Sequence, residues 1–362
     1  MTDPVTSAVN IADLERMGEA AMDPGAHGYF AGGAGDEVTL RENVSAFNGW
    51  RIRPRVLVDV SEASPATTVL GTDISMPVVV APVAFQRLAH PDGEEGMARA
   101  TAAAGTIMSL SSLATARPAD VAAAAPGSPR WFQLYCFSDR AATGALLDEA
   151  AASGYSAILL TVDAPRAGRR ERDFRTGFSV PPEVTVPSVQ AATGSTKPMT
   201  PAEIFALVDP SLDWDDLAEL VEGCALPVIL KGLMTEEDAR LAVDAGAAGV
   251  VVSNHGGRQL DRVQATIDAL PEVAEAVDGR IEVLMDGGIR RGTDVITALA
   301  LGAKAVLVGR PALWGLAAGG EAGARHALQL LHDEVALGLI LAGCPTPDHV
   351  TRAHVQRAGQ PR

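Results

Sequence analysis

Eight short runs of β-branched and aliphatic residues alternate with alanine-rich stretches along this chain of 362 residues. Such alternation is typical of repeated βα units, in which each strand is followed by a helix that packs on a parallel sheet. Successive runs end roughly 20 to 35 residues apart, the length of one strand plus one helix. Eight units predict an α/β fold that closes into a (β/α)8 barrel, the TIM barrel. The runs span residues 77–82, 106–112, 130–135, 157–163, 227–232, 249–255, 281–288 and 305–311.

One interval departs from this spacing, because about 70 residues separate the ends of the fourth and fifth runs. The excess, at about 177–213, is rich in proline, serine and threonine and lacks periodicity, which predicts an irregular insertion after the fourth strand. A long insertion at this end of a barrel is typical either of a lid or of a disordered excursion. The sequence favours neither.

The rest of the chain reads as one domain over 1–362, with the barrel expected at 71–345. Residues 1–70 precede the first strand, and their first half has helical character. We therefore expect an N-terminal helical extension that flanks the barrel.

Charge and cysteine content limit the possible functions. The 45 acidic and 29 basic residues give a net charge of −16, which argues against a nucleic-acid or anionic-membrane surface. The three cysteines are far apart and odd in number, so we expect neither a disulfide framework nor a metal site, and a reduced, cytoplasmic setting. We expect no signal peptide and no membrane span, because no apolar run is long enough.

The segment SNHGGRQLD, residues 253–261, follows the sixth predicted strand. Loops after the strands build the catalytic face of such barrels. His255 can take a proton near neutral pH, and Arg258 offers a planar fork that matches a carboxylate. Gly256 and Gly257 allow a sharp turn or a close backbone approach. The segment predicts chemistry on a small carboxylate substrate, although a strand-end histidine alone is more often structural.

Lysine also ends an apolar run, at Lys231 of PVILKG. Burying this ammonium is costly unless it meets an anion or an electron-rich cofactor, and the alternative is a lysine that extends to solvent.

The last two strands end in DGGIRRG, residues 286–292, and VGRP, residues 308–311. Loops after strands seven and eight commonly form phosphate sites in these barrels. The amides of Gly287, Gly288 and Gly309 beside Arg290 and Arg310 would suit a phosphate, whereas the alternative is two tight turns with surface arginines.

Taken together, these motifs resemble the FMN-dependent L-2-hydroxy acid oxidase and dehydrogenase family, which includes glycolate oxidase, lactate oxidase, mandelate dehydrogenase and hydroxymandelate oxidase. The resemblance covers nearly the whole chain, from GYFAGGAGDEVTL at residues 28–40 to LAGC at residues 341–344. It implies an FMN cofactor, a small-molecule 2-hydroxy acid substrate, and a homo-oligomer, specifically a tetramer.

The resemblance also implies roles for individual residues. His255 would be the catalytic base and Asp163 the carboxylate that orients it. Tyr29, Tyr135, Arg170 and Arg258 would bind the substrate, the two arginines through its carboxylate. The residues implied around FMN are Pro82, Val83, Ala84, Ser111, Gln133, Thr161, Lys231, Ser253, Asp286, Gly287, Gly288, Arg290, Gly309 and Arg310.

Three positions depart from common family patterns or select among its branches. Leu113 stands in SSLAT where many members carry tryptophan, which leaves room for a larger substrate. Phe30 replaces a frequent second tyrosine. Ala84 matches the oxidase and dehydrogenase branches, whereas glycine there resembles the lactate monooxygenase branch.

We therefore predict oxidation of an (S)-2-hydroxy acid larger than glycolate, mandelate-like or of medium chain length, to the 2-oxo acid, with O₂ reduced to H₂O₂. The enzymatic alternative is a dehydrogenase that passes electrons to a quinone, cytochrome or other carrier. An alternative of another class is a non-catalytic flavin-binding protein. Whether the base removes the α-proton or the hydroxyl proton is open, since both routes need the same residues.

Overall fold

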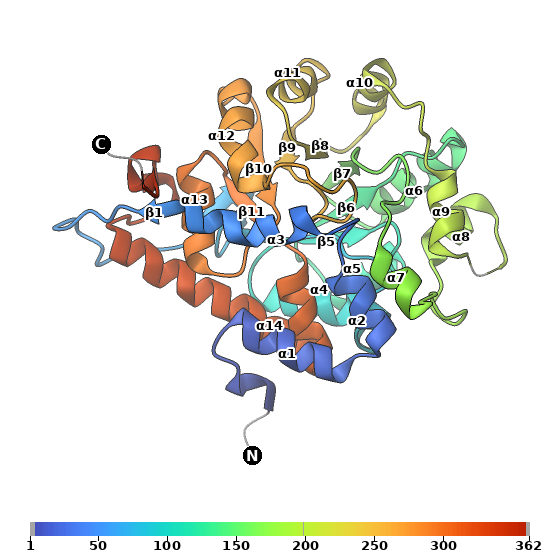
Figure 1. Cartoon of the computed structure of the whole chain (residues 1–362). Coiled ribbons are helices and arrows are strands. Elements are labelled where there is room, and N and C mark those ends of the chain that lie inside the picture. The colour runs from blue at the N-terminus through green and yellow to red at the C-terminus, as the bar shows by residue number, and fades with distance from the viewer. Residues whose placement is uncertain (1–3, 198, 360–362) are drawn as a thin grey trace.

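The computed structural model describes residues 4–197 and 199–359. Eight parallel strands close into a barrel in the order β10-β11-β4-β5-β6-β7-β8-β9, which confirms the predicted TIM barrel (Figure 1). The barrel strands are β4 (Val78–Val80), β5 (Met108–Ser111), β6 (Arg130–Leu134), β7 (Ala157–Thr161), β8 (Val228–Leu233), β9 (Gly249–Val252), β10 (Glu282–Asp286) and β11 (Ala305–Val308).

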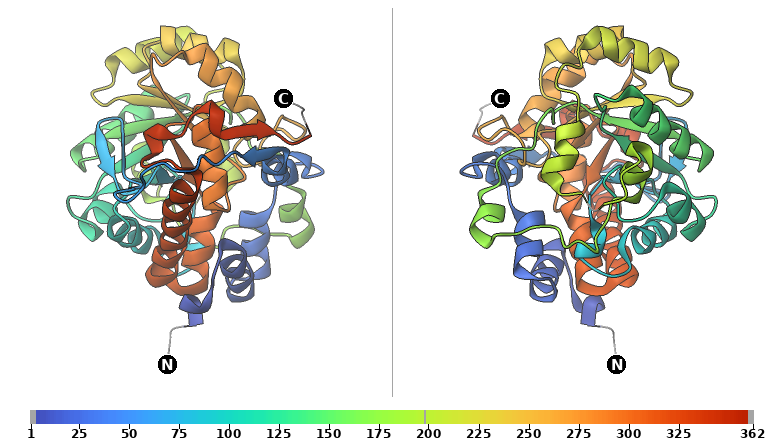
Figure 2. Two further views of the ribbon diagram at one scale, coloured as in Figure 1. Left: turned by 90° about the vertical axis from the view of Figure 1, so that its left-hand side faces the viewer. Right: turned by 90° about the vertical axis from the view of Figure 1, so that its right-hand side faces the viewer.

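Helices surround these strands on the outside (Figures 1 and 2). They are α4 (Gly93–Ala103), α5 (Pro118–Ala124), α6 (Arg140–Ala152), α10 (Trp214–Gly223), α11 (Glu236–Asp244), α12 (Thr266–Val277), α13 (Gly292–Ala300) and α14 (Arg310–Ala342). Within the described parts of the chain, no helix is both long and apolar enough to cross a membrane.

The N-terminal residues form the expected helices, namely α1 (Ile11–Ala21), α2 (Pro24–Ala31) and α3 (Val38–Ser45). Figure 2 shows α1 and α2 in blue packed beside the long α14. Strand β1 (Trp50–Ile52) pairs antiparallel with β12 (Val355–Arg357), so segments near the two ends of the chain meet. Short 3-10 helices are η1 (Pro4–Ser7), η2 (Ala46–Gly49), η3 (Gln86–Leu88), η4 (Pro347–His349) and η5 (Arg352–His354).

The barrel interior follows from the two-residue period of its strands, which turns every second side chain inward. Apolar side chains fill the part of the barrel away from the carboxyl ends of its strands. The hairpin of β2 (Thr67–Val69) and β3 (Thr72–Ile74) packs against them. The apolar side chains that come from the strands, or from the residue just before β5, include Val79, Ile107, Trp131, Leu159, Ile229, Val251, Leu284 and Leu307. Two residues further along the chain, at or just past the end of several strands, the inward positions are occupied by Ala81, Ser109, Gln133, Thr161, Lys231, Ser253, Asp286 and Gly309. Polar groups therefore gather at the carboxyl end of the barrel, above an apolar floor.

The insertion after β7 is more regular than its sequence predicts. It contains α7 (Glu171–Thr176), α8 (Pro187–Thr193) and α9 (Pro201–Leu207). Proline is the first residue of both α8 and α9, and Thr200 forms a capping box with Glu203 at the start of α9. The residues that suggested a loop therefore begin helices, and each helix is too short to show a period.

Helix α14 bends at Gly320, whose φ of 59° and ψ of −142° suit glycine almost alone. An added Cβ would lie 2.2 Å from Asp92 Oδ2, which accepts a bond from the Glu321 amide. Gly320→Ala should lower the free energy of unfolding in urea by about 1–3 kcal/mol. Gly144→Ala, in α6 with open space around it, is the control and should be neutral or slightly stabilising. Equal unfolding midpoints for the two variants would contradict a strained bend.

Candidate active site

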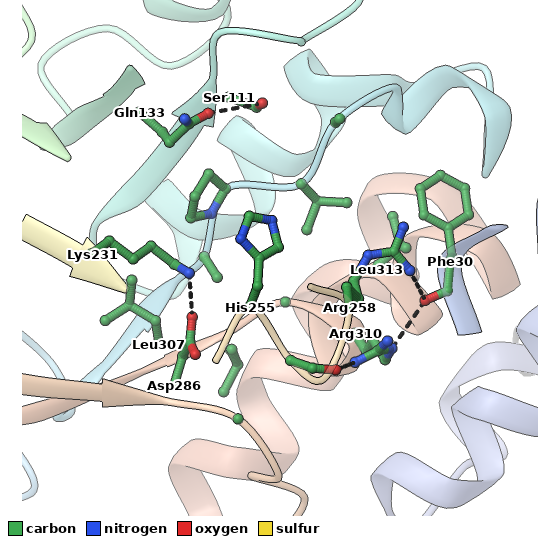
Figure 3. A pocket seen from close by; sticks show the side chains of 18 of the residues that line it. Phe30, Ser111, Gln133, Lys231, His255, Arg258, Asp286, Leu307, Arg310 and Leu313 are labelled. Carbon is green, nitrogen blue, oxygen red and sulfur yellow. Dashed lines mark hydrogen bonds and ion pairs between the residues drawn. The ribbon is translucent and has the colours of Figure 1, made fainter. Parts of the chain in front are cut away.

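A cavity opens where the carboxyl ends of the barrel strands meet (Figure 3). Its empty space, which includes open solvent at the mouth, is about 1120 Å³. All predicted site residues except Asp163 and Ser253 line it. They are Tyr29, Pro82, Val83, Ala84, Ser111, Gln133, Tyr135, Thr161, Arg170, Lys231, His255, Arg258, Asp286, Gly287, Gly288, Arg290, Gly309 and Arg310.

The imidazole of His255 faces the cavity and is held from behind. Its Nδ1 lies 2.9 Å from Asp163 Oδ1. Burial acts to raise the pKa of Asp163, but the charge and hydrogen bond of His255, with Lys231, outweigh burial and hold this pKa below its usual value. An ionised carboxylate only accepts, so Nδ1 carries the hydrogen and Nε2 is left as the basic nitrogen when the ring is neutral.

Lys231 lies in β8, two residues before its end, and is almost fully buried inside the barrel. Its Nζ lies 2.9 Å from Asp286 Oδ2 and donates to Ser253 Oγ at 2.8 Å. Burial acts to lower the pKa of this ammonium, but the carboxylates of Asp286 and Asp163 outweigh it and raise the pKa. The lysine therefore stays charged, with its ammonium paired to Asp286 inside the barrel, and does not extend to solvent.

Ser253 is fully buried and is not among the residues that line the cavity. Its hydroxyl oxygen accepts bonds from Lys231 Nζ and from the His255 amide, the latter at 3.1 Å. Ser253 therefore supports two cavity residues from behind.

Two partly buried guanidiniums meet the carboxyl end of α2. Arg258 Nη1 donates to the carbonyls of Tyr29 and Gly32 at 2.6 and 2.9 Å. Arg310 donates to the carbonyls of Phe30, Gly32 and Gly256, each at 2.9 Å. A helix C-terminus is a favourable place for cations, because its free carbonyls carry partial negative charge. Three of the five N–H groups of Arg310 are occupied in this way, which leaves two for a ligand.

Arg258, Arg290 and Arg310 form no ion pair with a carboxylate in the described ranges. Burial, and then the charge of Arg170, lowers the pKa of Arg258 to about 10. Burial also lowers the pKa of Arg290, and burial with the two neighbouring arginines lowers that of Arg310 well below its usual value. A buried cation without an anion is costly, so this cavity favours anionic ligands.

Tyr29 and Tyr135 add aromatic and hydroxyl groups to this region. The Tyr29 ring lies between the guanidiniums of Arg258 and Arg170, 5.0 and 5.2 Å from its centroid. Burial, with the charge of Asp163, raises the pKa of Tyr135 well above its usual value, so its hydroxyl stays protonated. The resulting surroundings suit a carboxylate with an aromatic or aliphatic neighbour.

Polar atoms on the opposite side of the cavity lack partners. Gln133 Nε2 and Thr161 Oγ1 are buried and make no hydrogen bond with the described protein atoms. The amide of Gln133 is oriented by its Oε1, which accepts from Ser111 Oγ at 3.2 Å (Figure 3). Buried polar atoms of this kind normally meet a ligand or water. A flat heterocycle with oxygen and nitrogen atoms at its edge, such as a flavin, would satisfy both, so the residues present fit FMN.

The loop after β10 comes close to α3. Gly287 and Gly288 have φ of 96° and 81°, and a Cβ on Gly288 would lie 1.9 Å from the Asn43 carbonyl. Only glycine permits this approach.

The lining residues that were not predicted as site residues include Phe205 and Gln259. Phe205 comes from α9 and meets the Tyr135 ring edge-on at 5.5 Å. Gln259 accepts from the Gly168 amide at 2.9 Å and donates to the carbonyls of Asp163 and Arg166. No local pattern marks Phe205, whereas Gln259 lies in the SNHGGRQLD segment but makes its contacts with residues about 90 positions away.

Comparisons with known proteins agree with this geometry. A family model described as FMN-dependent dehydrogenase matches residues 18–357. Glycolate oxidase 3 of Arabidopsis thaliana is 48% identical over 352 residues, covering 96% of this chain and 95% of the relative. L-lactate oxidase of Nostoc sp. is 48% identical over 349 residues, covering 94% and 96%. The crystal structure of mandelate oxidase with (S)-4-hydroxymandelic acid superposes with a TM-score of 0.91 at 41% identity, covering 97% of this chain and 99% of that one.

The unpaired guanidiniums generate a prediction about anion binding. Arg290→Met should weaken FMN binding to the apoprotein by about 10- to 100-fold, because a buried phosphate would lose a charge-assisted hydrogen bond. Arg291→Met is the control, since Arg291 points to Glu334 at 2.6 Å and should leave FMN affinity unchanged. Quenching of flavin fluorescence on titration measures both. Equal affinities would place Arg290 outside the phosphate site.

Proposed function

The chain belongs to the FMN-dependent dehydrogenase family and is an FMN-dependent 2-hydroxy acid oxidase, and we propose that it acts on (S)-2-hydroxy acids larger than glycolate. The observation that carries the proposed site is the placement of one base beside two arginines, of which Arg258 forms no ion pair with a carboxylate in the described part of the chain. His255, backed by Asp163, shares its cavity with Arg258 and Arg170. A 2-hydroxy acid offers a carboxylate to the cations and a removable proton to the base.

Binding and orientation are assigned to the arginines and tyrosines. Arg258 and Arg170 would hold the substrate carboxylate, and the protonated hydroxyl of Tyr135 would donate to a substrate oxygen. Fixing the carboxylate at two points also fixes the direction of the α-carbon substituents.

Proton transfer is assigned to His255. The Nε2 atom takes the proton, whether it comes from the α-carbon or from the hydroxyl group. Asp163 stabilises the imidazolium that results, because its carboxylate is ionised and bonded to Nδ1.

When bound, FMN supplies the acceptor for the two electrons that leave the substrate. The phosphate would be held by Arg290, Arg310 and the glycine loops, and the ring edge by Gln133, Thr161 and Lys231. The positive charge of Lys231 would favour negative charge on the bound cofactor.

The size preference rests on the apolar part of the cavity. Leu113, Tyr135 and Phe205 line it, together with the two arginines proposed to hold the substrate carboxylate. Leucine occupies less space than the indole common in the family at the matching position. Each additional buried methylene group stabilises a ligand by about 0.8 kcal/mol, or roughly fourfold in affinity. We therefore expect mandelate-like or medium-chain acids to react better than glycolate.

We further propose that O₂ is the electron acceptor, with H₂O₂ and the 2-oxo acid as products. A homotetrameric state, by resemblance to the family, and a cytoplasmic location are part of the same proposal. The free cysteines, Cys136, Cys224 and Cys344, are compatible with a reducing compartment.

His255→Ala should bind FMN and 2-oxo acids normally but slow anaerobic flavin bleaching by about 10²- to 10⁴-fold, the usual effect of losing a general base. Stopped-flow absorbance with (S)-lactate and (S)-mandelate measures the rate. Bleaching at the unmodified rate would refute the assignment of the base.

Leu113→Trp should reverse the size preference by filling the space beyond the substrate α-carbon. The measurement is kcat/KM for glycolate, (S)-lactate, (S)-2-hydroxyoctanoate and (S)-mandelate, with peroxide release as the signal. Phe205→Ala tests the insertion separately and should favour the largest acids further. If Leu113→Trp keeps the original ranking while Phe205→Ala changes it, the insertion rather than Leu113 sets substrate size.

A further inference from the structure

The loop that carries His255 has a strained backbone. His255, Gly256 and Gly257 are all left-handed, with φ of 59°, 63° and 75°. Glycine adopts these angles freely, whereas a histidine does so only when its surroundings hold it there. The contacts that fix this loop therefore also fix the position of the imidazole.

Asn254 closes the loop from inside the protein. Its Oδ1 accepts from the Gly257 amide at 3.1 Å, and its Nδ2 donates to the Gln264 carbonyl at 3.1 Å. The side chain thus links Gly257, at the end of the left-handed turn, to Asn254, which precedes the turn, and it also links Asn254 to Gln264 in the following segment.

Asn43, on α3, holds Asn254 in turn. The two amides form a reciprocal pair, in which each Nδ2 donates to the other Oδ1 at 2.8 Å. Both residues are buried, with 2% and 5% of their surface exposed, so an unpaired amide there would be costly. Asn43 Oδ1 also accepts from the Thr266 amide at 3.3 Å.

Asn43 does more than attach α3 to the barrel. Its carbonyl lies against Gly288 in the loop proposed to bind phosphate, so the same residue touches both functional loops. Helix α3 has a separate attachment through Thr39, whose amide donates to Asp261 Oδ1 at 2.9 Å and whose hydroxyl donates to the Val263 carbonyl at 3.0 Å. Attachment alone therefore does not account for the amide pair.

We propose that Asn43 is a positioning residue for catalysis, which acts through Asn254 to hold His255 in its left-handed conformation. The inference rests on the proposed role of His255 as the base. Asn43 lies outside the lining of the cavity and touches neither substrate nor proton. Its contribution is to the geometry of proton transfer, where a misplacement of about 1 Å costs roughly 10²-fold in rate.

The test compares Asn43→Ala, Asn254→Ala and their double variant in the FMN-loaded enzyme. The substrate is whichever of (S)-lactate and (S)-mandelate bleaches the unmodified flavin faster. Each single variant should slow bleaching at saturating substrate by about 10- to 100-fold while the dissociation constant of the matching 2-oxo acid stays unchanged. The double variant should be about as slow as the slower single variant, because both changes remove the same pair.

Thr39→Val is the matched control, since it removes a buried hydrogen bond of α3 without touching Asn254. It should lower the free energy of unfolding but leave the bleaching rate unchanged. Asn43→Asp is the second variant in case alanine impairs folding. It keeps the acceptor for Asn254 and the overall shape but loses the donor, so it should also slow bleaching.

Rates for Asn43→Ala and Asn43→Asp equal to that of Thr39→Val, or effects that multiply in the double variant, would overturn the inference. His255→Ala in the same assay separates failure of the positioning role of Asn43 from failure of the proposed base. If His255→Ala is slow and the Asn43 variants are not, only the positioning role fails. If His255→Ala bleaches at the unmodified rate, the proposed base fails as well.

Discussion

Closure of eight parallel strands with a two-residue side-chain period decides where the chemistry of this protein can lie. The inward positions form layers, and the lower layers are filled by residues such as Leu159, Ile229 and Val251. The next inward positions include Thr161, Lys231 and Ser253, which lie at the carboxyl end of the barrel. A lysine can be buried there because β10, two strands away from β8, presents Asp286 to its ammonium at 2.9 Å. The same closure that buries the core therefore assembles the polar end of the cavity.

The cavity also holds several arginine side chains in a partly buried place, where their charges must be stabilised. Arg258 and Arg310 share the carbonyls at the end of α2, so the N-terminal extension supplies part of their stabilisation. This solvation is incomplete, because burial and mutual repulsion still hold the pKa values of both guanidiniums down. The remaining cost can be offset by an anionic ligand, which links the affinity of the site for a phosphate or a carboxylate to the electrostatics of the free protein.

Short-range rules are enough to predict the strands, which follow from apolar runs of regular spacing. The positions of His255 and Lys231 in the cavity follow from their place at or near strand ends. The helices α8 and α9 were missed because proline and threonine mark both loops and helix starts. Phe205 and Asn43 could not be found by such rules, since each acts through contacts between distant segments, as in the pairing of Asn43 with Asn254. The contact of Ser253 with Lys231 is likewise a matter of side-chain direction.

The cavity is built from two kinds of structure. The end proposed to hold FMN uses barrel strand ends and the glycine loops after β10 and β11. The end proposed to hold the substrate draws instead on segments outside the strands, including Tyr29 of α2, Leu113 after β5, Arg170 before α7 and Phe205 of α9. Changes in these segments can alter the space beside the substrate without moving Lys231 or the dyad of His255 and Asp163. Relatives that share this barrel and carry the names glycolate, lactate and mandelate oxidase are consistent with such a division, because only the adaptable end needs to differ among them.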